Sequence, residues 1–354
     1  MDPRVHKLAH LLVHYSLKLK KGKLLKIQGE PVTMPLILAC YEEAMKVGAY
    51  PYIQVFSIEA DELFYKHATK AQMEYLSPML KLEANKMDAL ISLWGTTNTR
   101  YLNHIDPKRI AQRRLARKAY IQKLFKRMGD GSITWVGTMY PTDADAQQAE
   151  MSLSEYEDFV YGAGYLHLKD PVVHWNKIEK EQKRLVRILN RIDRLHVRSA
   201  DTDLKMRVKG RKWISCHGTE NFPDGEIFTG PIEDSVEGHI KYSYPSTYGG
   251  RTVEGIRLEF QKGKIVNESA TKGGEYLTAM LNMDKGARFV GEFAIGTNYQ
   301  VQQATGNTLF DEKIGGSCHL AAGASIPESG GVNKSALHWD MVCDLKKDLS
   351  LIHI

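Results

Sequence analysis

The pattern of apolar residues changes near Ala200, and this change constrains the fold more than any other feature of the sequence. Before it, helical periodicity alternates with short apolar runs typical of buried strands. After it, glycines become frequent and short strands of alternating polarity follow one another. The first pattern predicts a three-layer α/β domain with a mostly parallel sheet over residues 1–198, and the second an antiparallel β-rich domain over 199–354.

The expected elements of the first part are set by periodicity and by its interruptions. Helices are expected over 5–17, 34–47 and 179–196, and strands over 24–27, 52–56, 88–94 and 133–136. Pro35 suits the first turn of the second helix and Gly48 its end. The last helix is expected to link the two domains. None of these strands is followed by a dinucleotide-binding fingerprint, so the turn at Gly95 is interpreted as part of the scaffold.

The second part is expected to be built from hairpins. Strands are expected over 204–208, 212–215, 256–260 and 264–266, with turn residues such as Gly263 between the last two. One helix is expected over 274–281.

Charge is distributed unevenly along the chain. Residues 215–354 contain 12 lysines and arginines against 18 aspartates and glutamates, whereas the whole chain carries a net charge of +6. Basic residues gather in 100–127 and 177–198. Such runs occur in nucleic-acid-binding proteins, but the spacing of Ile110, Leu115, Ile121 and Leu124 favours an amphipathic helix with a solvated basic face. We therefore favour a solvated helix face over a nucleic-acid interface.

Composition suits a globular protein of the cytoplasm. The chain is 43% hydrophobic and 25% charged. No apolar run is long enough to cross a bilayer, and the N-terminus lacks the pattern of a signal peptide. The cysteines are scattered, which argues against a disulfide framework and for a reducing compartment; they are Cys40, Cys216, Cys318 and Cys343.

The acidic C-terminal part contains a set of residues suited to divalent metals. The candidate ligands are Glu226, Glu292, His319, His338 and Asp340. Oxygen and imidazole donors without thiolate favour zinc, cobalt or manganese in a catalytic site. Any one of these residues alone is more often a surface or satisfied core residue, so the prediction depends on the set. The set indicates hydrolysis assisted by two metal ions.

Local spacing supports this interpretation. Side chains alternate faces along a strand, so His338 and Asp340 point the same way if 335–345 is extended, and Trp339 points into packing. By the same alternation Cys318 faces away from His319 and is expected to be a buried thiol. Glycine directly before each of the two glutamates lets the backbone approach closely where ligands converge.

The chain resembles the thermophilic-type metalloaminopeptidases, the aminopeptidase T and aminopeptidase S group of peptidase family M29, in several motifs that occur in the same order as in that family. They include the segments 11–17 followed by Gly22, 140–142, 151–152, 221–226, 291–294, 311–316 and 330–340. The resemblance covers nearly the whole chain. It implies that the five candidate residues bind two metals with one carboxylate bridging, that the substrates are peptides with a free N-terminus, and that the protein is a homodimer.

Glu292 is the first candidate for the bridging carboxylate and for proton transfer to the leaving amine. Glu312 and Glu328 are weaker candidates for proton transfer. The run Asp311–Glu312–Lys313 is an alternative source of hydrogen bonds that orient His319.

The chain departs from the family at one position. Family members usually carry a tyrosine before the proline of the segment that follows the first histidine, where it stabilises the oxyanion, and here Ile326 precedes Pro327. Ser325 or Ser329 offers a neighbouring hydroxyl. An alternative interpretation is therefore a catalytically weakened relative that binds metal or peptide, and a less favoured one is a basic nucleic-acid-associated protein.

Overall fold

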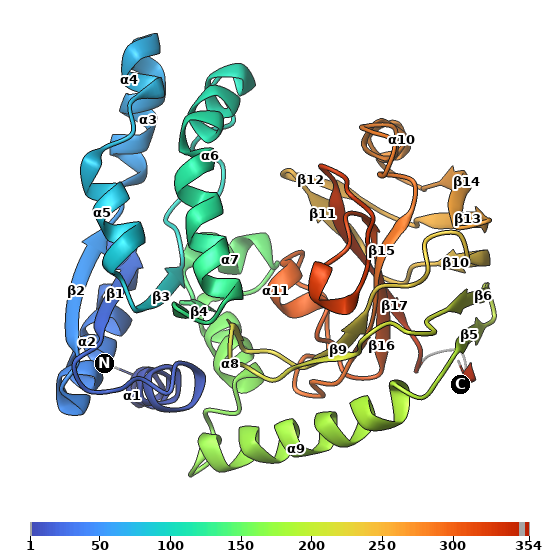
Figure 1. The fold of residues 1–354 in the computed structure, drawn as a ribbon, viewed down its shortest axis with the longest axis horizontal. Helices are drawn as coiled ribbons and strands as arrows, with labels where there is room; N and C mark the ends of the chain where they lie inside the picture. Colours follow the sequence, from blue (N-terminus) through green and yellow to red (C-terminus); the bar gives the residue numbers. More distant parts are fainter. Residues whose placement is uncertain (1, 347–350, 354) are drawn as a thin grey trace. The chain divides into compact units, whose positions relative to one another are not determined.

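Five parallel strands form the sheet of the first compact unit, in the order β2-β1-β3-β4-β8 (Figure 1). The computed structural model describes residues 2–346 and 351–353. The strands are β1 Leu24–Gly29, β2 Tyr50–Val55, β3 Ala89–Trp94, β4 Thr134–Met139 and β8 Asn221–Phe222. Every neighbouring pair among them is parallel, as the alternation of helices and apolar runs predicted.

Helices flank this sheet. They are α1 Pro3–Leu11, α2 Met34–Val47, α3 Ile58–His67, α4 Lys70–Glu74, α5 Pro78–Lys86, α6 Pro107–Gly129, α7 Asp143–Gln148 and α8 Leu153–Ala163, with a π-helix at Leu12–Ser16 and a 3₁₀ turn at Pro31–Thr33. Leu90 of β3 packs with Tyr120 and Leu124 of α6. The neighbouring residues of β3 point to the opposite face of the sheet.

Local sequence sets the ends of these helices. Gly48 takes a left-handed conformation with φ of 80° and ends α2 where the sequence predicted. Asp106 caps α6 by accepting from the Lys108 backbone N–H, and Pro107 occupies its first turn. Ser152 and Glu155 form a capping box at the start of α8.

The second compact unit begins within α9 Pro171–Leu189 and contains antiparallel sheets, which confirms the predicted change of architecture. One sheet has the order β14-β13-β10-β6-β5-β18 and another the order β17-β16-β15-β9-β7. The strands are β5 Arg194–Ser199, β6 Thr202–Arg207, β7 Ile214–Cys216, β9 Glu226–Thr229, β10 Glu237–Lys241, β11 Ser246–Tyr248, β12 Arg251–Val253, β13 Arg257–Gln261, β14 Lys264–Ser269, β15 Val290–Gly296, β16 Ser317–Gly323, β17 His338–Asp344 and β18 Leu351–His353. Helices α10 Gly274–Leu281 and α11 Thr308–Asp311 and a 3₁₀ turn at Pro327–Ser329 complete it.

The core of this unit contains apolar side chains from both of these sheets. Val197 and Leu204 belong to the first, and Phe293, Leu320 and Trp339 belong to the second. Burial of this apolar surface, at about 25 cal/mol per Å², is the main favourable contribution to folding. The sheet that carries β15, β16 and β17 is therefore fixed by its packed face.

Two expectations about helices need correction. The helix expected over 179–196 is α9, which begins earlier and ends at Leu189, and 194–199 forms strand β5. In β5 the buried Leu195 and Val197 alternate with polar residues, and this period of two outweighs the helical pattern. In α6 the predicted apolar face is partly wrong, because Leu115 is 70% exposed whereas Tyr120 and Leu124 are buried.

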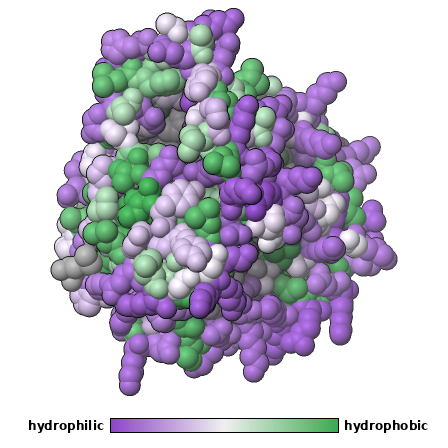
Figure 2. Space-filling model, turned by 60° about the vertical axis from the view of Figure 1, so that its left-hand side comes forward, coloured by the Kyte–Doolittle hydropathy of each residue, from purple (hydrophilic) through white to green (hydrophobic). Residues whose placement is uncertain are grey.

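The compact units divide the chain after Val172, and Gly218–Phe222 returns to the first unit through β8. The boundary expected between residues 198 and 199 stays a prediction about domains. No helix of the described residues is long and apolar enough to cross a membrane. Hydrophilic side chains dominate the face drawn in Figure 2, with apolar ones between them.

Candidate metal centre

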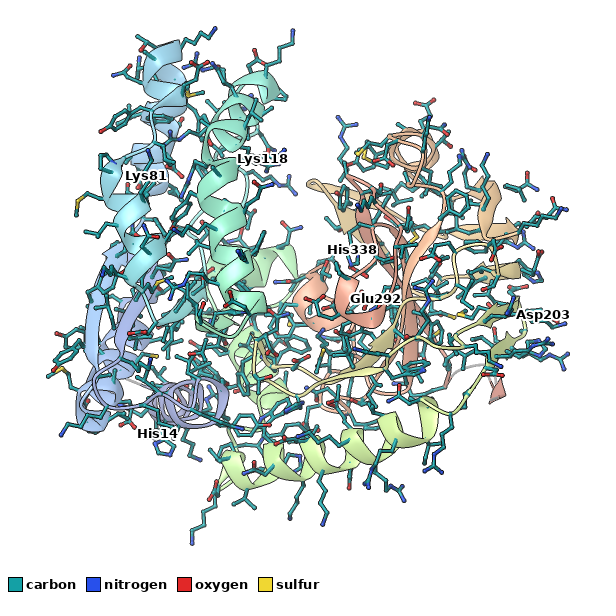
Figure 3. All side chains as sticks on the ribbon, in the orientation of Figure 1. His14, Lys81, Lys118, Asp203, Glu292 and His338 are labelled. Carbon is teal, nitrogen blue, oxygen red and sulfur yellow. The ribbon has the colours of Figure 1, made fainter. Side chains whose placement is uncertain are left out.

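The five predicted ligands lie together in the second unit, on strands of a single sheet. Glu226 begins β9, Glu292 lies on β15, His319 on β16, and His338 and Asp340 on β17. Figure 3 labels Glu292 on β15 and His338 on β17. Residues more than 100 positions apart in the sequence thus meet because the strands β9, β15, β16 and β17 are adjacent in the sheet.

The strand register places all five on the same face. The directly opposed pairs are Glu226 with Gly296, His319 with Ala294, Ala321 with both Glu292 and Asp340, and His338 with Gly323. Opposed residues of antiparallel strands share a face. The residues between them, including Trp339 and Cys318, belong to the apolar core. The predicted orientations of Trp339 and Cys318 are therefore confirmed.

Glycine before each glutamate has a steric reason. A Cβ on Gly291 would lie 2.0 Å from the Ala324 carbonyl oxygen, and the register of β15 shifts there between Val290 and Glu292. Gly225 has φ of 132°, which side chains rarely adopt, and a Cβ there would lie 2.6 Å from the Asn298 Cβ. These positions set the direction in which the two glutamates leave the backbone.

The side chains approach one another at distances suited to shared cations. His319 Nε2 lies 3.5 Å from both Glu226 Oε2 and Glu292 Oε1, and 4.0 Å from Asp340 Oδ1. His338 Nε2 lies 3.6 Å from Glu292 Oε2 and 3.7 Å from Asp340 Oδ1. Two donors that each lie about 2.0–2.2 Å from a tetrahedral ion are separated by roughly 3.3–3.6 Å. Little movement is needed for these atoms to bind the same ions.

Several of these atoms are buried and lack a hydrogen-bond partner among the described residues. They are Glu226 Oε2, both ring nitrogens of His319, and Asp340 Oδ1. Buried polar atoms are nearly always hydrogen-bonded, and ligand atoms of a metal centre are a regular exception because the cation satisfies them. The donor set and its burial therefore fit divalent metal ions.

The five predicted ligands all belong to two of the groups of three possible metal ligands. One contains Glu226, Glu312 and His319, and the other Glu292, His338 and Asp340, with the ligand atoms of each group within 4.8 Å of one another. Glu312 was expected only as a weaker candidate, and it lies in the first group. Glu328 is exposed. The sequence signal for Glu312 was its place in the run Asp311–Glu312–Lys313, which by itself is not specific.

Lys313 is the buried counter-charge of this region and was not singled out as such in the sequence. Its side chain is 1% exposed, and its ammonium lies 2.7 Å from Glu226, 2.5 Å from Glu312 and 3.5 Å from Asp224. Burial alone would lower the pKa of Lys313, but the surrounding carboxylates raise it well above its usual value. The lysine therefore stays charged and holds Glu226 and Glu312 in place.

Burial dominates the protonation of the acidic ligands. It raises the pKa of Glu226 to about 8, against the opposing charge of Lys313. Burial likewise raises the pKa of Asp340 to about 6, partly offset by His338. Burial alone would lower the pKa of His319, but Glu292 and the charges of Glu226 and Asp340 raise it to about 9. In the metal-free protein these groups retain protons that a cation must displace.

One histidine is oriented by the backbone. His338 Nδ1 lies 2.8 Å from the Ala324 carbonyl oxygen, so Nδ1 carries the proton and donates it. Nε2, which points toward Glu292 and Asp340, is then free to bind a metal. The same segment continues into Ile326 and the 3₁₀ turn at Pro327–Ser329.

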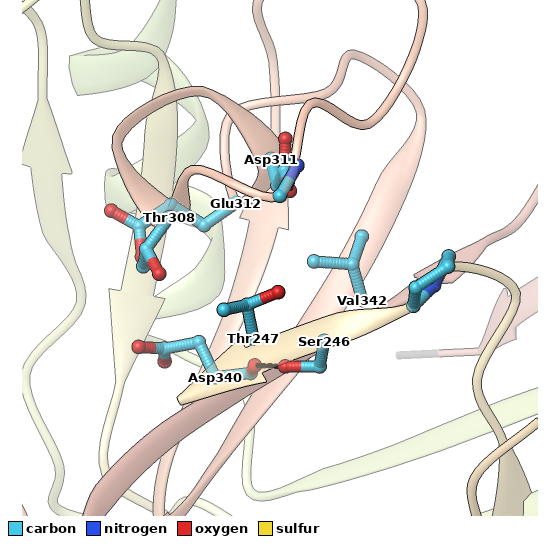
Figure 4. Close-up of a pocket in the computed structure, with 9 residues that line it drawn as sticks. Ser246, Thr247, Thr308, Asp311, Glu312, Asp340 and Val342 are labelled. Atoms are coloured by element: carbon cyan, nitrogen blue, oxygen red, sulfur yellow. Dashed lines mark hydrogen bonds between the residues drawn. The ribbon is translucent and has the colours of Figure 1, made fainter. Parts of the chain in front are cut away.

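A small polar pocket lies beside the centre (Figure 4). It is lined by Pro245, Ser246, Thr247, Gly306, Thr308, Asp311, Glu312, Asp340 and Val342. Three of these are carboxylic acids, and two of the three also belong to the groups of possible metal ligands. Burial raises the pKa of Asp311 to about 6, although backbone N–H groups of Thr305 and Gly306 stabilise its charged form. The pocket is acidic enough to favour a cationic group.

Comparisons with known proteins agree on one family. The sequence profile of the thermophilic metalloproteases (M29) matches residues 1–353. The chain is 27% identical to Aminopeptidase 2 of Geobacillus stearothermophilus, over 96% of this chain and 92% of that protein. It is 26% identical to Aminopeptidase T of Thermus thermophilus, over 92% and 85%. The solved structure of wild-type AmpT from Thermus thermophilus superposes with a TM-score of 0.86 at 23% identity, covering 99% of this chain and 94% of that one, which shows a shared fold.

The raised pKa values predict how the stability of the metal-free protein depends on pH. A group whose pKa is higher in the folded than in the unfolded chain favours folding at low pH, and this contribution is lost as the pH rises through the folded value. The pKa values of Glu226, Asp340 and His319 are all raised, to about 8, 6 and 9. Urea denaturation of metal-depleted protein should show an unfolding free energy that falls by roughly 2–5 kcal/mol from pH 5 to 9.

Zinc should reverse this trend, because metal binding requires the deprotonated ligands and strengthens as the pH rises. Glu312, whose pKa is lowered, titrates below this window and does not oppose it. Equal or greater stability of the metal-depleted protein at pH 9 than at pH 5 would contradict the assigned burial of these charges.

Proposed function

Because this chain belongs to the M29 family of thermophilic metalloproteases and is a metallo-aminopeptidase, we propose that it releases N-terminal amino acids from peptides with the help of two divalent metal ions. The ions would be held by Glu226, Glu292, His319, His338 and Asp340, with Glu312 as a further ligand. The observation that carries the proposal is the convergence of these buried side chains, several with unpartnered ligand atoms, on one face of a sheet.

The residue types indicate the metal and its contribution. Carboxylates and imidazoles favour zinc, cobalt or manganese. A pair of such ions supplies a Lewis acid for the scissile carbonyl and activates water at neutral pH.

Glu292 is suited to join the two ions and to move a proton. Its Oε1 faces His319 of one ligand group and its Oε2 faces His338 of the other, at 3.5 and 3.6 Å. A carboxylate in this position can accept a proton from the attacking water and pass it to the leaving amine. Lys313 supports this role indirectly, because its single positive charge offsets part of the negative charge of Glu226 and Glu312.

The acidic pocket supports a preference for a free N-terminus. Asp311, Glu312 and Asp340 line it, and clustered carboxylates attract an ammonium group. A cytoplasmic location and a homodimer also belong to the proposal. All four cysteines lie within the described residues and are free thiols, which suits a reducing compartment.

Reconstitution tests the proposal directly. Metal-depleted protein, loaded with zinc, cobalt or manganese, should bind about two ions per chain in excess of any surface binding. It should then cleave peptides with free N-termini and leave the same peptides intact when they are N-acetylated. Cleavage of both forms at similar rates would contradict an aminopeptidase, and a centre that holds no metal would contradict the ligand set.

Glu292→Gln tests the bridging and proton-transfer role. The substitution keeps the size of the side chain and removes its charge, so turnover should fall by roughly 10²–10⁴, while the thermal melting of the metal-free protein changes little. Glu275→Gln on α10, an exposed position of the same unit, is the matched control and should retain full activity. Near-normal turnover of Glu292→Gln would rule out the assigned role.

Substitutions at Ile326 test whether the missing tyrosine hydroxyl limits turnover. Of the two neighbouring hydroxyls, Ser329 Oγ already donates to the Ile326 carbonyl at 2.7 Å and accepts from Gly331, whereas Ser325 Oγ is buried without a hydrogen-bond partner among the described residues. We expect Ile326→Tyr to raise turnover, because one oxyanion donor is typically worth roughly 10²–10³ in rate. Ile326→Phe, which adds the ring without the hydroxyl, should not.

A slower Ile326→Tyr variant would show that another group has taken this role. Ser325→Ala should then reduce turnover more than Ser329→Ala. If no variant cleaves peptide although two ions bind, the weakened-relative interpretation gains support.

A further inference from the structure

A separate group of possible metal ligands lies in the first unit, and none of its residues belongs to the metal centre described above. His10 lies on α1, His14 on the π-helix that follows, and Glu43 on α2. The ligand atoms of these three residues lie within 4.8 Å of one another. Figure 3 labels His14, which lies on the surface of this unit.

The three side chains converge on a single point. His10 Nδ1 and His14 Nε2 each lie 3.0 Å from the same oxygen, Glu43 Oε2. The two imidazole rings are 4.2 Å apart, centre to centre. Residues four apart on a helix are neighbours on its surface, and this spacing is the one by which paired histidines share a metal ion.

The arrangement suits an open, water-completed coordination site. The side chains of His10 and His14 are 56% and 37% exposed, so an ion can reach them and water can fill the remaining positions. The nitrogen-to-oxygen separations are close to the roughly 3.3 Å expected for two ligands of one zinc ion. A small widening of the existing contacts is sufficient.

The Glu43 carboxylate is oriented by its neighbours. Glu43 is 15% exposed, and its other oxygen accepts from the Lys46 ammonium at 2.9 Å. Burial would raise the pKa of Glu43, but Lys46, His10 and His14 lower it to about 2. Glu43 Oε1 is thus fixed by Lys46, while Oε2 faces the two imidazoles.

We propose that His10, His14 and Glu43 form a surface site for a divalent transition-metal ion of the zinc class, distinct from the catalytic centre. Two imidazoles and one carboxylate are a ligand set that zinc, copper and nickel prefer over magnesium or calcium. Because the ligands come from consecutive helical segments and from α2, a bound ion ties the π-helix to α2.

Zinc titration of metal-depleted protein, in competition with a chromogenic chelator, tests the site. Wild type should bind about one more zinc ion per chain than the double variant His10→Gln/His14→Gln, and Glu43→Gln should also bind that ion at least about tenfold more weakly. His67→Gln, which removes an exposed imidazole at the end of α3, is the matched control and should bind as wild type does.

A second measurement separates binding from any effect on folding. Without zinc the double variant should melt as wild type does, and excess zinc should raise the melting temperature of wild type by more than that of the double variant. Peptidase activity should be equal in the two, since neither histidine belongs to the catalytic centre.

Equal zinc stoichiometry in wild type and in the double variant would overturn the proposal. Failure of the catalytic centre to bind metal would lower the zinc count of both proteins equally. It would leave the difference of about one ion intact, so the two proposals fail independently.

Discussion

The burial of several carboxylates at one point is the constraint on which the second unit depends. The side chains of Glu226, Glu292 and Asp340 are only 8%, 4% and 10% exposed, and Glu312 lies beside them. Each ionised carboxylate removed from water costs several kcal/mol unless it is paired. Lys313 supplies one permanent positive charge, which does not balance the set. Protons or divalent cations must supply the rest, and this requirement explains both the raised pKa values and the suitability for metal.

Strand alternation resolves the conflict between a charged site and a stable core. The same three strands that carry Glu292, His319 and Asp340 on one face place Phe293, Leu320 and Trp339 in the apolar core on the other. The residues opposed to the ligands are small, with Ala294, Ala321 and Gly323 among them. Small side chains leave room over the sheet, so the longer ligands can bend toward a common point.

Much of this could be predicted from the sequence where a single period is dominant. The parallel sheet, α2 and α10 follow from uninterrupted patterns with clear stops, and the orientations of Trp339 and Cys318 follow from alternation. The short strands β10, β11 and β12 carry too few residues to show a period. The helix expected over 179–196 was wrong at its end, because Leu195 continues the helical spacing of Leu189 and Ile192 but also alternates with Val197 in a strand.

The ligands of the site could be predicted from the sequence, but the residues that hold them in place could not. His338 and Asp340 are recognisable from local spacing and from resemblance to the family. The place of Lys313 depends on contacts with Asp224 and Glu226, almost ninety residues earlier in the chain, and no local pattern encodes such contacts. Glu312 could not be separated from Glu328 by residue type alone, whereas burial separates them at once.

The apolar side of the sheet also fixes the ligands, through Trp339. Its indole N–H donates to the Ser246 hydroxyl at 2.7 Å, and that hydroxyl donates in turn to the Asp340 carbonyl oxygen at 2.7 Å. Tyr248 of the neighbouring hairpin stacks on the same indole, with ring centres 5.4 Å apart. The residue between His338 and Asp340 is thus held from behind by packing and by hydrogen bonds. A site that must bring donors to within a few tenths of an ångström requires such support, because a loosely held ligand loses both affinity and geometry.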